Sequence, residues 1–305
     1  MAAFEISLVI CTYNRDKYLP EALESIRHQT LPANQFQLII VDNNSTDNTA
    51  AIAENFINAN PGLNVKYAFE GNKGLSFARN RGIQEAESNI ISYVDDDALL
   101  SPGFLSEMLH FFHTHPQAAG AGGRVIPKYE DGIEPKWMNK YLNGFIGRVD
   151  FGEEIRKFDK AMKYPAGCNM TYKKDVLLKA GGFNNSLTFR SDDKYIAYKV
   201  KEHADEIYYV PKASVRHYID RHRLELSNFR KLFLKTGNEE KVRIKTEHGT
   251  FKLFKKGMEF AIKTTASVLI YLLYTLKGQE IKGRYVFLSQ WFTLRGFFMK
   301  NVHVR

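Results

Sequence analysis

The first 125 residues alternate between two hydrophobic periods. Four short apolar runs with many β-branched residues are typical of strands that are covered on both faces. Between and after these runs, apolar residues recur at the spacing of a helix. The expected strands are residues 6–11, 36–42, 63–69 and 89–95, and the expected helices are residues 19–26, 45–60, 76–87 and 103–115. This alternation predicts an α/β fold with a mostly parallel, Rossmann-like sheet and helices on both faces.

The pattern loosens after Gly123. Residues 127–164 mix Trp137, several Tyr and Phe, and clustered charges without a clean period, so we expect an irregular or lid-like segment. Further along, we expect a short strand and a helix within residues 165–183 and a helix over residues 192–204. A last strand over residues 206–211 is expected to end at Pro211. For the second helix of the chain, Ser45 or Thr46 is the expected N-cap.

From about Phe251 the sequence predicts a long helix with one apolar face. The face consists of Phe254, Met258, Ala261, Ile262, Thr265, Val268, Leu269, Leu272, Leu273 and Leu276. The uncharged stretch Thr264–Leu276 has 13 residues. It is therefore roughly 20 Å long, which is too short to span about 30 Å of bilayer hydrocarbon. Two interpretations remain open: an interfacial helix with flanking lysines, or a helix packed on the domain.

Charge divides the chain of 305 residues into two parts. The net charge is +9, but residues 216–305 carry 19 Lys and Arg against 7 Asp and Glu, whereas residues 1–215 carry 24 against 27. A basic C-terminal part suits nucleic acid, anionic lipid or an acidic substrate, and charge alone does not choose among them.

Cysteine usage and the N-terminus indicate a cytoplasmic protein. Cys11 and Cys168 are the two cysteines, and neither has metal-binding spacing, so we expect both to be reduced. The N-terminal apolar run lacks a basic region and is interrupted by Thr12 and Asn14, which argues against a signal peptide.

Polar side chains follow three of the expected parallel strands. The first strand ends in Thr12-Tyr13-Asn14, the second in Asp42, and the fourth in Asp95-Asp96-Asp97. Because ligands bind at the carboxyl ends of parallel strands, this convergence predicts a polar ligand. Three adjacent carboxylates repel one another unless a cation is close, so they predict a metal site. Asp42 has an alternative role in turn and capping hydrogen bonds.

The type of phosphate site can be narrowed by what the sequence lacks. It contains neither Gly-x-Gly-x-x-Gly after the first strand nor Gly-x(4)-Gly-Lys-Ser/Thr anywhere. Carboxylates that hold Mg²⁺ or Mn²⁺ are the other way to neutralise a diphosphate. A sugar-phosphate nucleotidyltransferase is a rival, but its usual glycine-rich loop is missing from "CTYNRDKYLP". A nucleic-acid-binding module is disfavoured, because acids at the strand ends would repel phosphate.

Several segments, in order and spacing, resemble the inverting family 2 glycosyltransferases with the GT-A fold. They are "SLVICTYNRDKYLPEALESIRHQT", "IIVDNNSTDNT", "GLSFARNRGIQEA", "YVDDDA", "GCNMTYKKDVLLKAGGFNNSL" and the pair Asp192-Asp193. The resemblance covers residues 5–220. It implies sugar transfer from a nucleotide-diphosphate donor, most simply a UDP-sugar, to an acceptor hydroxyl.

The resemblance also implies roles for individual residues. The expected nucleotide-binding residues are Thr12, Tyr13, Asn14, Asp42 (to the N3–H of uracil), Arg79 (near the base or diphosphate), Asp95 and Asp96. Asp97 matches the metal ligand, and His217 matches a histidine near the metal or diphosphate, although a structural role for His217 stays open. Asp193 matches the catalytic base. Relatives usually have Glu-Asp where this chain has Asp192-Asp193, which leaves open which acid does the chemistry.

The expected organisation follows from these matches. Residues 1–220 would form the GT-A domain, with residues 1–125 as the nucleotide-sugar-binding half and 126–220 as the acceptor and catalytic half. Residues 221–305 would form a basic helical extension. The expected partners are the donor and a glycan or lipid-linked glycan acceptor of the cell envelope, with no nucleic acid. Peripheral contact with the inner face of the membrane through residues 251–300 is a further expectation.

Overall fold

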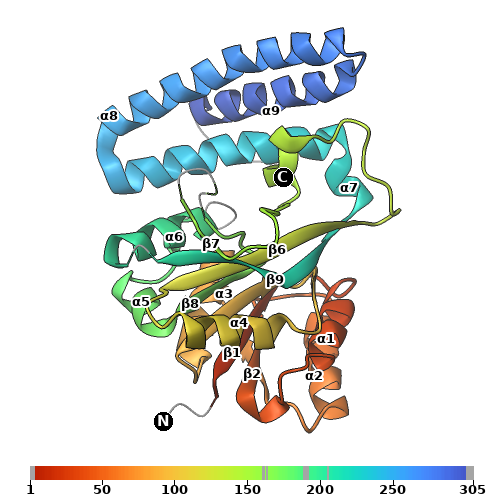
Figure 1. Cartoon of the computed structure of the whole chain (residues 1–305), viewed down its shortest axis with the longest axis vertical. Coiled ribbons are helices and arrows are strands. Elements are labelled where there is room, and N and C mark those ends of the chain that lie inside the picture. Colours follow the sequence, from red (N-terminus) through yellow and green to blue (C-terminus); the bar gives the residue numbers. More distant parts are fainter. Residues whose placement is uncertain (1–3, 160–161, 163, 188–191, 205, 300–305) are drawn as a thin grey trace. The chain divides into compact units, whose positions relative to one another are not determined.

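The structure is a computed structural model that describes residues 4–159, 162, 164–187, 192–204 and 206–299. The chain forms two compact units, coloured along the sequence in Figure 1. Unit 1 contains Met1–Pro127 and Gly147–Tyr218, and unit 2 contains Lys128–Ile146 and Ile219–Arg305. The boundary near residue 219 lies close to the one expected after residue 220, but the segment 128–146 groups with the C-terminal helices.

The four predicted parallel strands are present in unit 1. They are β1 (Ile6–Thr12), β2 (Phe36–Asp42), β3 (Val65–Phe69) and β4 (Ile90–Asp95), in the order β3-β2-β1-β4. All three neighbouring pairs are parallel, with Thr12 of β1 opposite Asp42 of β2 and Cys11 opposite Asp95 of β4. The polar strand ends therefore meet at one edge of the sheet.

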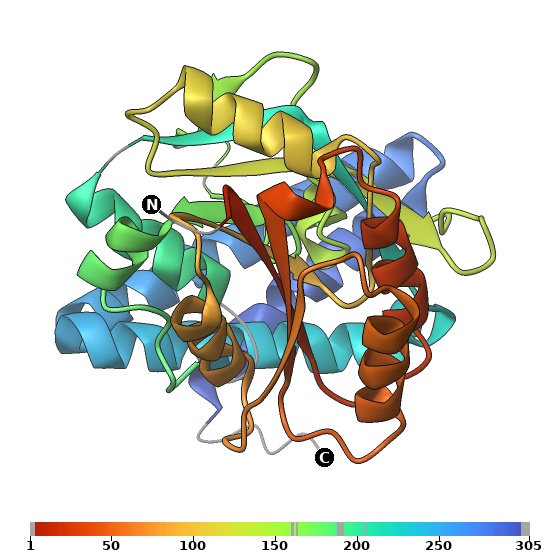
Figure 2. The ribbon, with the colours of Figure 1, turned by 90° about the horizontal axis from the view of Figure 1, so that it is seen from below.

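The four helices predicted among these strands are also confirmed. They are α1 (Leu19–Arg27), α2 (Thr49–Ala59), α3 (Leu75–Glu85) and α4 (Phe104–Thr114). Figure 2 shows α1 and α2 on one side of β1–β4 and α3 on the other. The strands β1, β2 and β4 are buried on both faces, whereas β3 at the sheet edge is mostly not. The N-cap prediction was wrong, because α2 begins at Thr49 after Asn48 and residues 45–46 lie in the preceding loop.

Beyond β4 the sheet becomes antiparallel. The elements of unit 1 after β4, apart from α4, are β5 (Ala98–Leu100), β6 (Gly120–Tyr129), β7 (Arg156–Lys157), β8 (Met170–Lys173), α5 (Lys174–Lys179), α6 (Asp192–His203) and β9 (Ile207–Ile219). Earlier in the chain, a short 3-10 helix (Ala33–Gln35) precedes β2. The strand order continues β4-β8-β6-β9-β5, and β7 pairs with β9. The sheet is thus mixed, with a parallel half and an antiparallel half.

Two of these strands differ from the sequence-based expectation. The last strand does not end at Pro211 but continues to Ile219, because its pairing with β5 resumes from Val215 to His217. The strand β6 was not predicted, because it begins with glycines rather than with an apolar run. Gly123 allows a close approach there: a Cβ at this position would lie 1.6 Å from the carbonyl oxygen of Ala213.

The aromatic side chains of the segment without a clear period pack against the helices of unit 2. Its elements are a 3-10 helix (Lys140–Phe145), α7 (Arg221–Leu224), α8 (Leu226–Leu276) and α9 (Glu280–Phe298). Trp137 stacks on Tyr285 of α9 with ring centroids 4.4 Å apart, and it contacts Phe229 of α8 edge-on at 5.7 Å. The aromatic residues are therefore the core of this unit. Its long helices follow Arg221, where the helical extension was expected to start, although the apolar face was recognised only from about Phe251.

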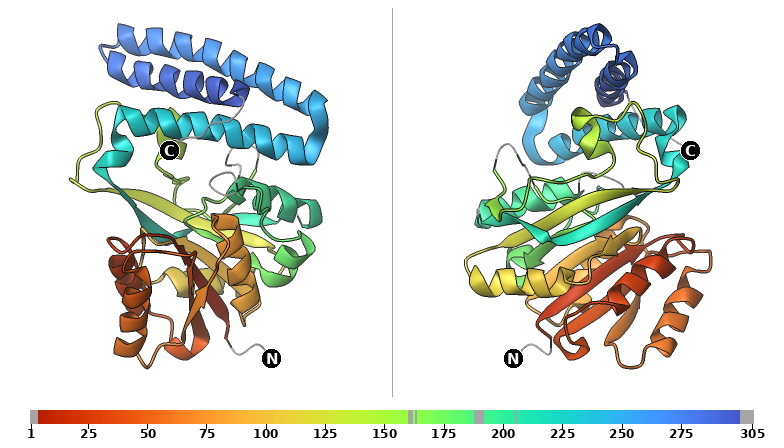
Figure 3. Two further views of the ribbon diagram at one scale, coloured as in Figure 1. Left: turned by 180° about the vertical axis from the view of Figure 1, so that it is seen from behind. Right: turned by 45° about the vertical axis from the view of Figure 1, so that its right-hand side comes forward.

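The helices of unit 2 approach one another at glycines. Figure 3 shows the C-terminal half of α8 running beside α9. A Cβ at Gly296 of α9 would lie 2.0 Å from the carbonyl oxygen of Leu234, and a Cβ at Gly237 of α8 would lie 2.1 Å from that of Thr293. Backbone atoms cannot move away as a side chain can, so these two positions need glycine.

We therefore expect Gly296→Ala to destabilise unit 2. The added methyl group forces the two helices apart, which costs about 1–3 kcal/mol or more. Gly144→Ala is the matched control in the same unit, because a Cβ there meets nothing within 4 Å. Thermal unfolding followed by circular dichroism should show a lower melting temperature for Gly296→Ala only. Equal melting temperatures for the two variants would contradict this packing.

Candidate functional site

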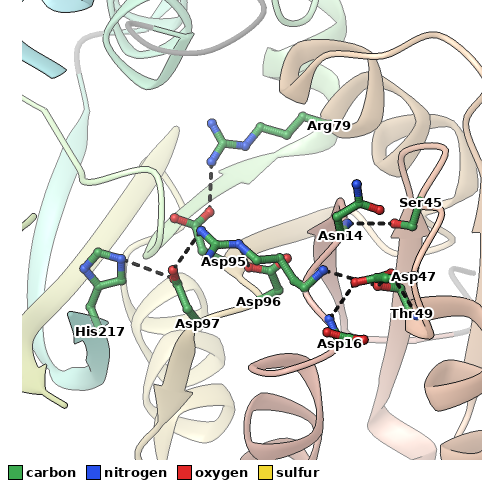
Figure 4. Close-up of polar contacts among 11 residues, drawn as sticks. Asn14, Asp16, Ser45, Asp47, Thr49, Arg79, Asp95, Asp96, Asp97 and His217 are labelled. Carbon is green, nitrogen blue, oxygen red and sulfur yellow. Dashed lines mark hydrogen bonds and ion pairs between the residues drawn. The ribbon is translucent and has the colours of Figure 1, made fainter. Parts of the chain in front are cut away.

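The loops after β1 and β2 are joined by side-chain hydrogen bonds. Asn14 adopts a left-handed backbone with φ 52° and donates its N–H to Ser45 Oγ at 3.0 Å (Figure 4). Asp47 accepts the N–H of Asp16 at 3.0 Å and that of Thr49, the first residue of α2, also at 3.0 Å. Of these residues, Asn14 was expected to meet a ligand, and the hydrogen bonds show that it also helps to fix the two loops as one frame.

Within this frame Tyr13 presents an open aromatic ring. Its side chain is exposed, whereas Thr12 beside it is buried. Lys73 lies over the ring, with Nζ 5.2 Å from the ring centroid and 3.2 Å from the hydroxyl. An exposed ring at the carboxyl edge of the sheet can stack on a planar base.

Asp42 makes the turn hydrogen bonds of the alternative interpretation. It is buried, and its carboxylate accepts the Tyr67 hydroxyl at 2.7 Å and the Ser45 N–H at 2.8 Å. These bonds hold the carboxylate at the end of β2. Contact between Asp42 and a nucleotide base stays a prediction.

The three acids after β4 lie among cations. Asp96 and Asp97 are buried, and Arg15 lies 3.7 Å from Asp96 and 3.4 Å from Asp97. The pairing of Ala98 with His217 brings that histidine from β9 to the cluster, where its Nε2 is 3.2 Å from Asp97 Oδ1 (Figure 4). The structure thus brings together the two predicted metal ligands, which are 120 residues apart in sequence. Sequence reasoning missed Arg15, although its position directly after Asn14 places it at the same edge.

Burial and repulsion make these acids hold protons tightly. Burial, followed by the charge of Asp97, raises the pKa of Asp96 to about 8. Burial also raises the pKa of Asp95, although Arg79 opposes the shift. Near pH 7 the cluster therefore favours a bound proton unless another cation enters it.

A second cationic side chain, that of Arg79, lies next to the cluster. It is buried and contacts three acceptors: Asp95 at 3.3 Å, the carbonyl oxygen of Gly167 at 3.1 Å, and Asp192 in a very short ion pair. Burial alone would lower the pKa of the guanidinium, but the charges of Asp192 and Asp95 raise it above its usual value. Arg79 thus connects the end of β4 with the first residue of α6.

The acid pair at the start of α6 is divided by this contact. Asp192 is buried and paired with Arg79, whereas Asp193 is only half-buried. Asp193 Oδ1 accepts the N–H of Lys194 at 2.7 Å, in the first turn of the helix. Of the two carboxylates, Asp193 is the one that solvent and a ligand can reach.

The donor atoms at the cluster fit a divalent cation. Asp95, His217 and Cys168 place one ligand atom each within 4.8 Å of the others. Carboxylate and imidazole ligands suit Mn²⁺ and, with more oxygens, Mg²⁺. Cys168 was not predicted to lie beside these residues, since no metal-binding spacing marks it in the sequence, and its soft thiol is not a ligand that Mg²⁺ or Mn²⁺ prefers.

Charge balance supports the same conclusion. Four carboxylates, Asp95, Asp96, Asp97 and Asp192, contact two guanidinium groups, those of Arg15 and Arg79. This group of six side chains is two positive charges short of neutrality when every acid is ionised, and one short when Asp96 holds a proton. A divalent cation that displaces this proton would supply the missing charge.

Comparison with known proteins agrees with the motifs. Residues 7–181 match the family model described as glycosyl transferase family 2. The glucosyl-dolichyl phosphate glucuronosyltransferase of Haloferax volcanii is 24% identical over 233 residues, which are 72% of this chain and 71% of that protein. The minor teichoic acid biosynthesis protein GgaB of Bacillus subtilis is 38% identical over 112 residues, which are 37% of this chain and only 12% of that protein.

Solved structures with this architecture are also glycosyltransferases. A mannosyltransferase from Pyrobaculum calidifontis, in complex with GDP-Man and Mn²⁺, has a TM-score of 0.62 at 14% identity and covers 93% of this chain and 85% of that one. S. aureus TarS 1–349 in complex with UDP-GlcNAc has a TM-score of 0.58 at 18% identity and covers 93% and 90%. These likenesses confirm the predicted GT-A fold. The chain therefore belongs to glycosyl transferase family 2, and it is a glycosyltransferase.

Proposed function

We propose that this protein is an inverting transferase that moves a sugar from a nucleoside-diphosphate donor, most simply a UDP-sugar, to an acceptor hydroxyl. One observation carries the proposal: the acids Asp95–Asp97 and His217 meet at the carboxyl edge of the sheet. Through Arg79, the same cluster is joined to the helix that carries Asp193. The reaction needs a diphosphate site and a base, and the proposed residues for both are connected through Arg79.

The donor would lie over the ends of β1, β2 and β4. The ring of Tyr13 would stack on the base, with Thr12 and Asn14 beside the nucleotide and Asp42 nearest the base edge. Asp95 and Asp96 would serve the ribose and the surroundings of the cation. Arg79 would lie near the diphosphate and, because it is buried and paired, would also position Asp95 and Asp192.

The cation would be Mn²⁺ or Mg²⁺, held by Asp97 and His217 with Asp95 nearby. When bound, it would stabilise the negative charge that develops on the leaving nucleoside diphosphate. The residues of the chain hold the diphosphate end of the donor in place, and the acceptor approaches from the side of Asp193.

Asp193 would act as the general base. It would accept the proton of the acceptor hydroxyl, whose oxygen attacks the anomeric carbon from the face opposite the leaving group. This single displacement inverts the configuration and needs no covalent intermediate. Asp192 would keep Arg79 and the start of α6 in place, and this pairing supports Asp193 as the member of the pair that does the chemistry.

The acceptor would be a glycan or lipid-linked glycan of the cell envelope. The proposal draws on the names of relatives that act on a glucosyl-dolichyl phosphate and in teichoic acid synthesis. The reaction would take place in the cytoplasm, at the inner face of the membrane where such acceptors are anchored. A reaction at the membrane would bring the basic C-terminal helices close to lipid.

The two acids of the pair should respond differently to the same substitution. Asp193→Asn should reduce transfer by about 10²–10⁴-fold, the usual contribution of a general base, while UDP binding and the melting temperature stay near those of the wild type. Asp192→Asn should lower stability by about 3–5 kcal/mol, because it leaves Arg79 buried without its nearest counter-charge. Sugar-transfer assays, UDP titration and thermal unfolding check both. An active Asp193→Asn variant would overturn the assignment.

Cation binding should depend on pH. The pKa of Asp96 near 8 means that the cluster must release a proton when a cation enters below that pH. Mn²⁺ affinity, measured by calorimetry in the presence of UDP, should therefore rise by up to about tenfold per pH unit from pH 6 to 8 and level off above it. Asp96→Asn should flatten this dependence. Equal affinity at pH 6 and pH 8 in the wild type would contradict the shared proton.

A further inference from the structure

The C-terminal half of α8 exposes its largest apolar side chains. They follow one another at intervals of one, three, four or seven residues, so they lie on one face of the helix. Each is between 51% and 85% exposed: Phe251, Phe254, Met258, Ile262, Leu269, Leu272, Leu273 and Leu276. We call this face the outer stripe. Protein surfaces normally carry single, scattered apolar residues, whereas this stripe is a continuous row of them.

Part of the opposite face of the same helix is polar and small. Where α8 packs against α9, the buried residues include Thr264 and Ser267 of α8 and Gly283, Ser289 and Thr293 of α9. The four hydroxyls donate to carbonyl oxygens of their own helices, at 2.6–2.9 Å, rather than across the contact. This part of the contact thus relies on close approach of small residues, whereas Phe260 of α8 packs on Phe297 of α9 with ring centroids 5.3 Å apart.

Around Thr264 and Ser267 this arrangement is the reverse of an amphipathic helix in water. A helix that packs in water buries Leu, Ile and Phe and leaves Ser and Thr outside. Helices that meet in hydrocarbon instead bring small residues together and direct large apolar residues outward, because the lipid is as apolar as the side chains. This part of the α8–α9 pair, with its exposed Leu and Ile residues, follows the second pattern.

The charges beside the stripe indicate which lipid surface it fits. From residue 251 to 277 there are five lysines and one acid, Glu259. Glu259 is paired with Lys256 and Lys263, so the segment presents a net positive charge. Lysines beside an inserted apolar face reach anionic headgroups, each contributing about 1 kcal/mol to binding.

The segment fits an orientation in the plane of the bilayer. By length and composition alone, the 26 residues Phe251–Leu276, with a mean hydropathy of 1.2, could cross a membrane. However, the uncharged part is roughly 20 Å long and ends at Lys277, and the turn to α9 continues with Glu280 and Lys282. Spanning would bury or translocate these charges, whereas an in-plane helix keeps them at the headgroups.

We propose that the outer stripe of α8 inserts into the headgroup boundary of an anionic bilayer, with the helix parallel to the surface. The inference deepens the membrane contact of the proposed function, and it rests on unit 2 alone. It needs neither the donor nor the cation. A lipid surface is the occupant because the stripe is linear, flanked by lysines and backed by a contact of the kind that helices make in hydrocarbon.

Vesicle flotation of the full chain tests the proposal. Vesicles of phosphatidylcholine and phosphatidylglycerol at 7:3 should carry the protein upward, and vesicles of phosphatidylcholine alone should carry at least about tenfold less. Salt at 0.5 M should weaken the binding, since it screens the lysines. Sodium carbonate at pH 11 should release the protein; retention would mean a spanning helix and overturn the in-plane orientation.

A pair of substitutions tests the stripe itself. Ile262→Gln with Leu269→Gln should reduce vesicle binding at least tenfold without lowering the melting temperature, because both side chains are exposed. Ile133→Gln with Leu178→Gln is the matched control, since these two are equally exposed but lie outside the stripe. Equal binding of the wild type and the stripe variant would overturn the proposal.

The remaining outcomes separate this inference from others. If light scattering shows a wild-type dimer that the stripe variant converts to monomer, and flotation is unaffected, the stripe is an interface between copies of the chain and the proposal fails. Stabilisation by UDP should be the same in the wild type and the stripe variant. If the protein binds vesicles but no nucleotide stabilises it, the proposed function is wrong and the membrane-binding proposal stands. If nucleotides stabilise it but it does not bind vesicles, the membrane-binding proposal is wrong and the proposed function stands.

Discussion

The structure depends on negative charge that is concentrated at the end of one strand. Three carboxylates follow β4, and a fourth reaches them from α6 through Arg79. Unit charges a few ångströms apart inside a protein interact strongly, so this group persists only because cations are built around it. Arg15 comes from the loop after β1 and Arg79 from α3, and His217 of β9 contacts Asp97. Strand pairing and core packing bring these elements to the acids.

The mixed sheet makes this convergence possible. The parallel half delivers the loops after β1, β2 and β4 to one edge, and the antiparallel half adds β9 with His217 through its pairing with β5. Close approach of β6 to its neighbour at Gly123 is part of the same construction. The acids outnumber the guanidinium groups that contact them, so the site is short of positive charge when the acids are ionised. A divalent cation would correct this imbalance and would attract a diphosphate.

The sequence predicted elements with a regular apolar period and site residues that are consecutive in the chain. The four parallel strands and their helices follow from apolar runs, and Asp95–Asp97 could be recognised because they are consecutive. The pairing of Arg79 with Asp192 joins residues that are 113 positions apart, and nothing local in the sequence indicates it. Cys168 was missed for the same reason. The aromatic segment 128–146 packs against α8 and α9 by shape rather than by period, so its pattern predicted only irregularity.

The most direct measurement is the thermal stability of the protein with nucleoside diphosphates, in the presence and absence of Mn²⁺. If the acid cluster is a cation and diphosphate site, UDP should raise the melting temperature with Mn²⁺ and have little effect without it. The Asp97→Ala variant should lose this cation-dependent shift while it stays folded. A shift that is independent of Mn²⁺, or no response to any nucleoside diphosphate, would contradict the site.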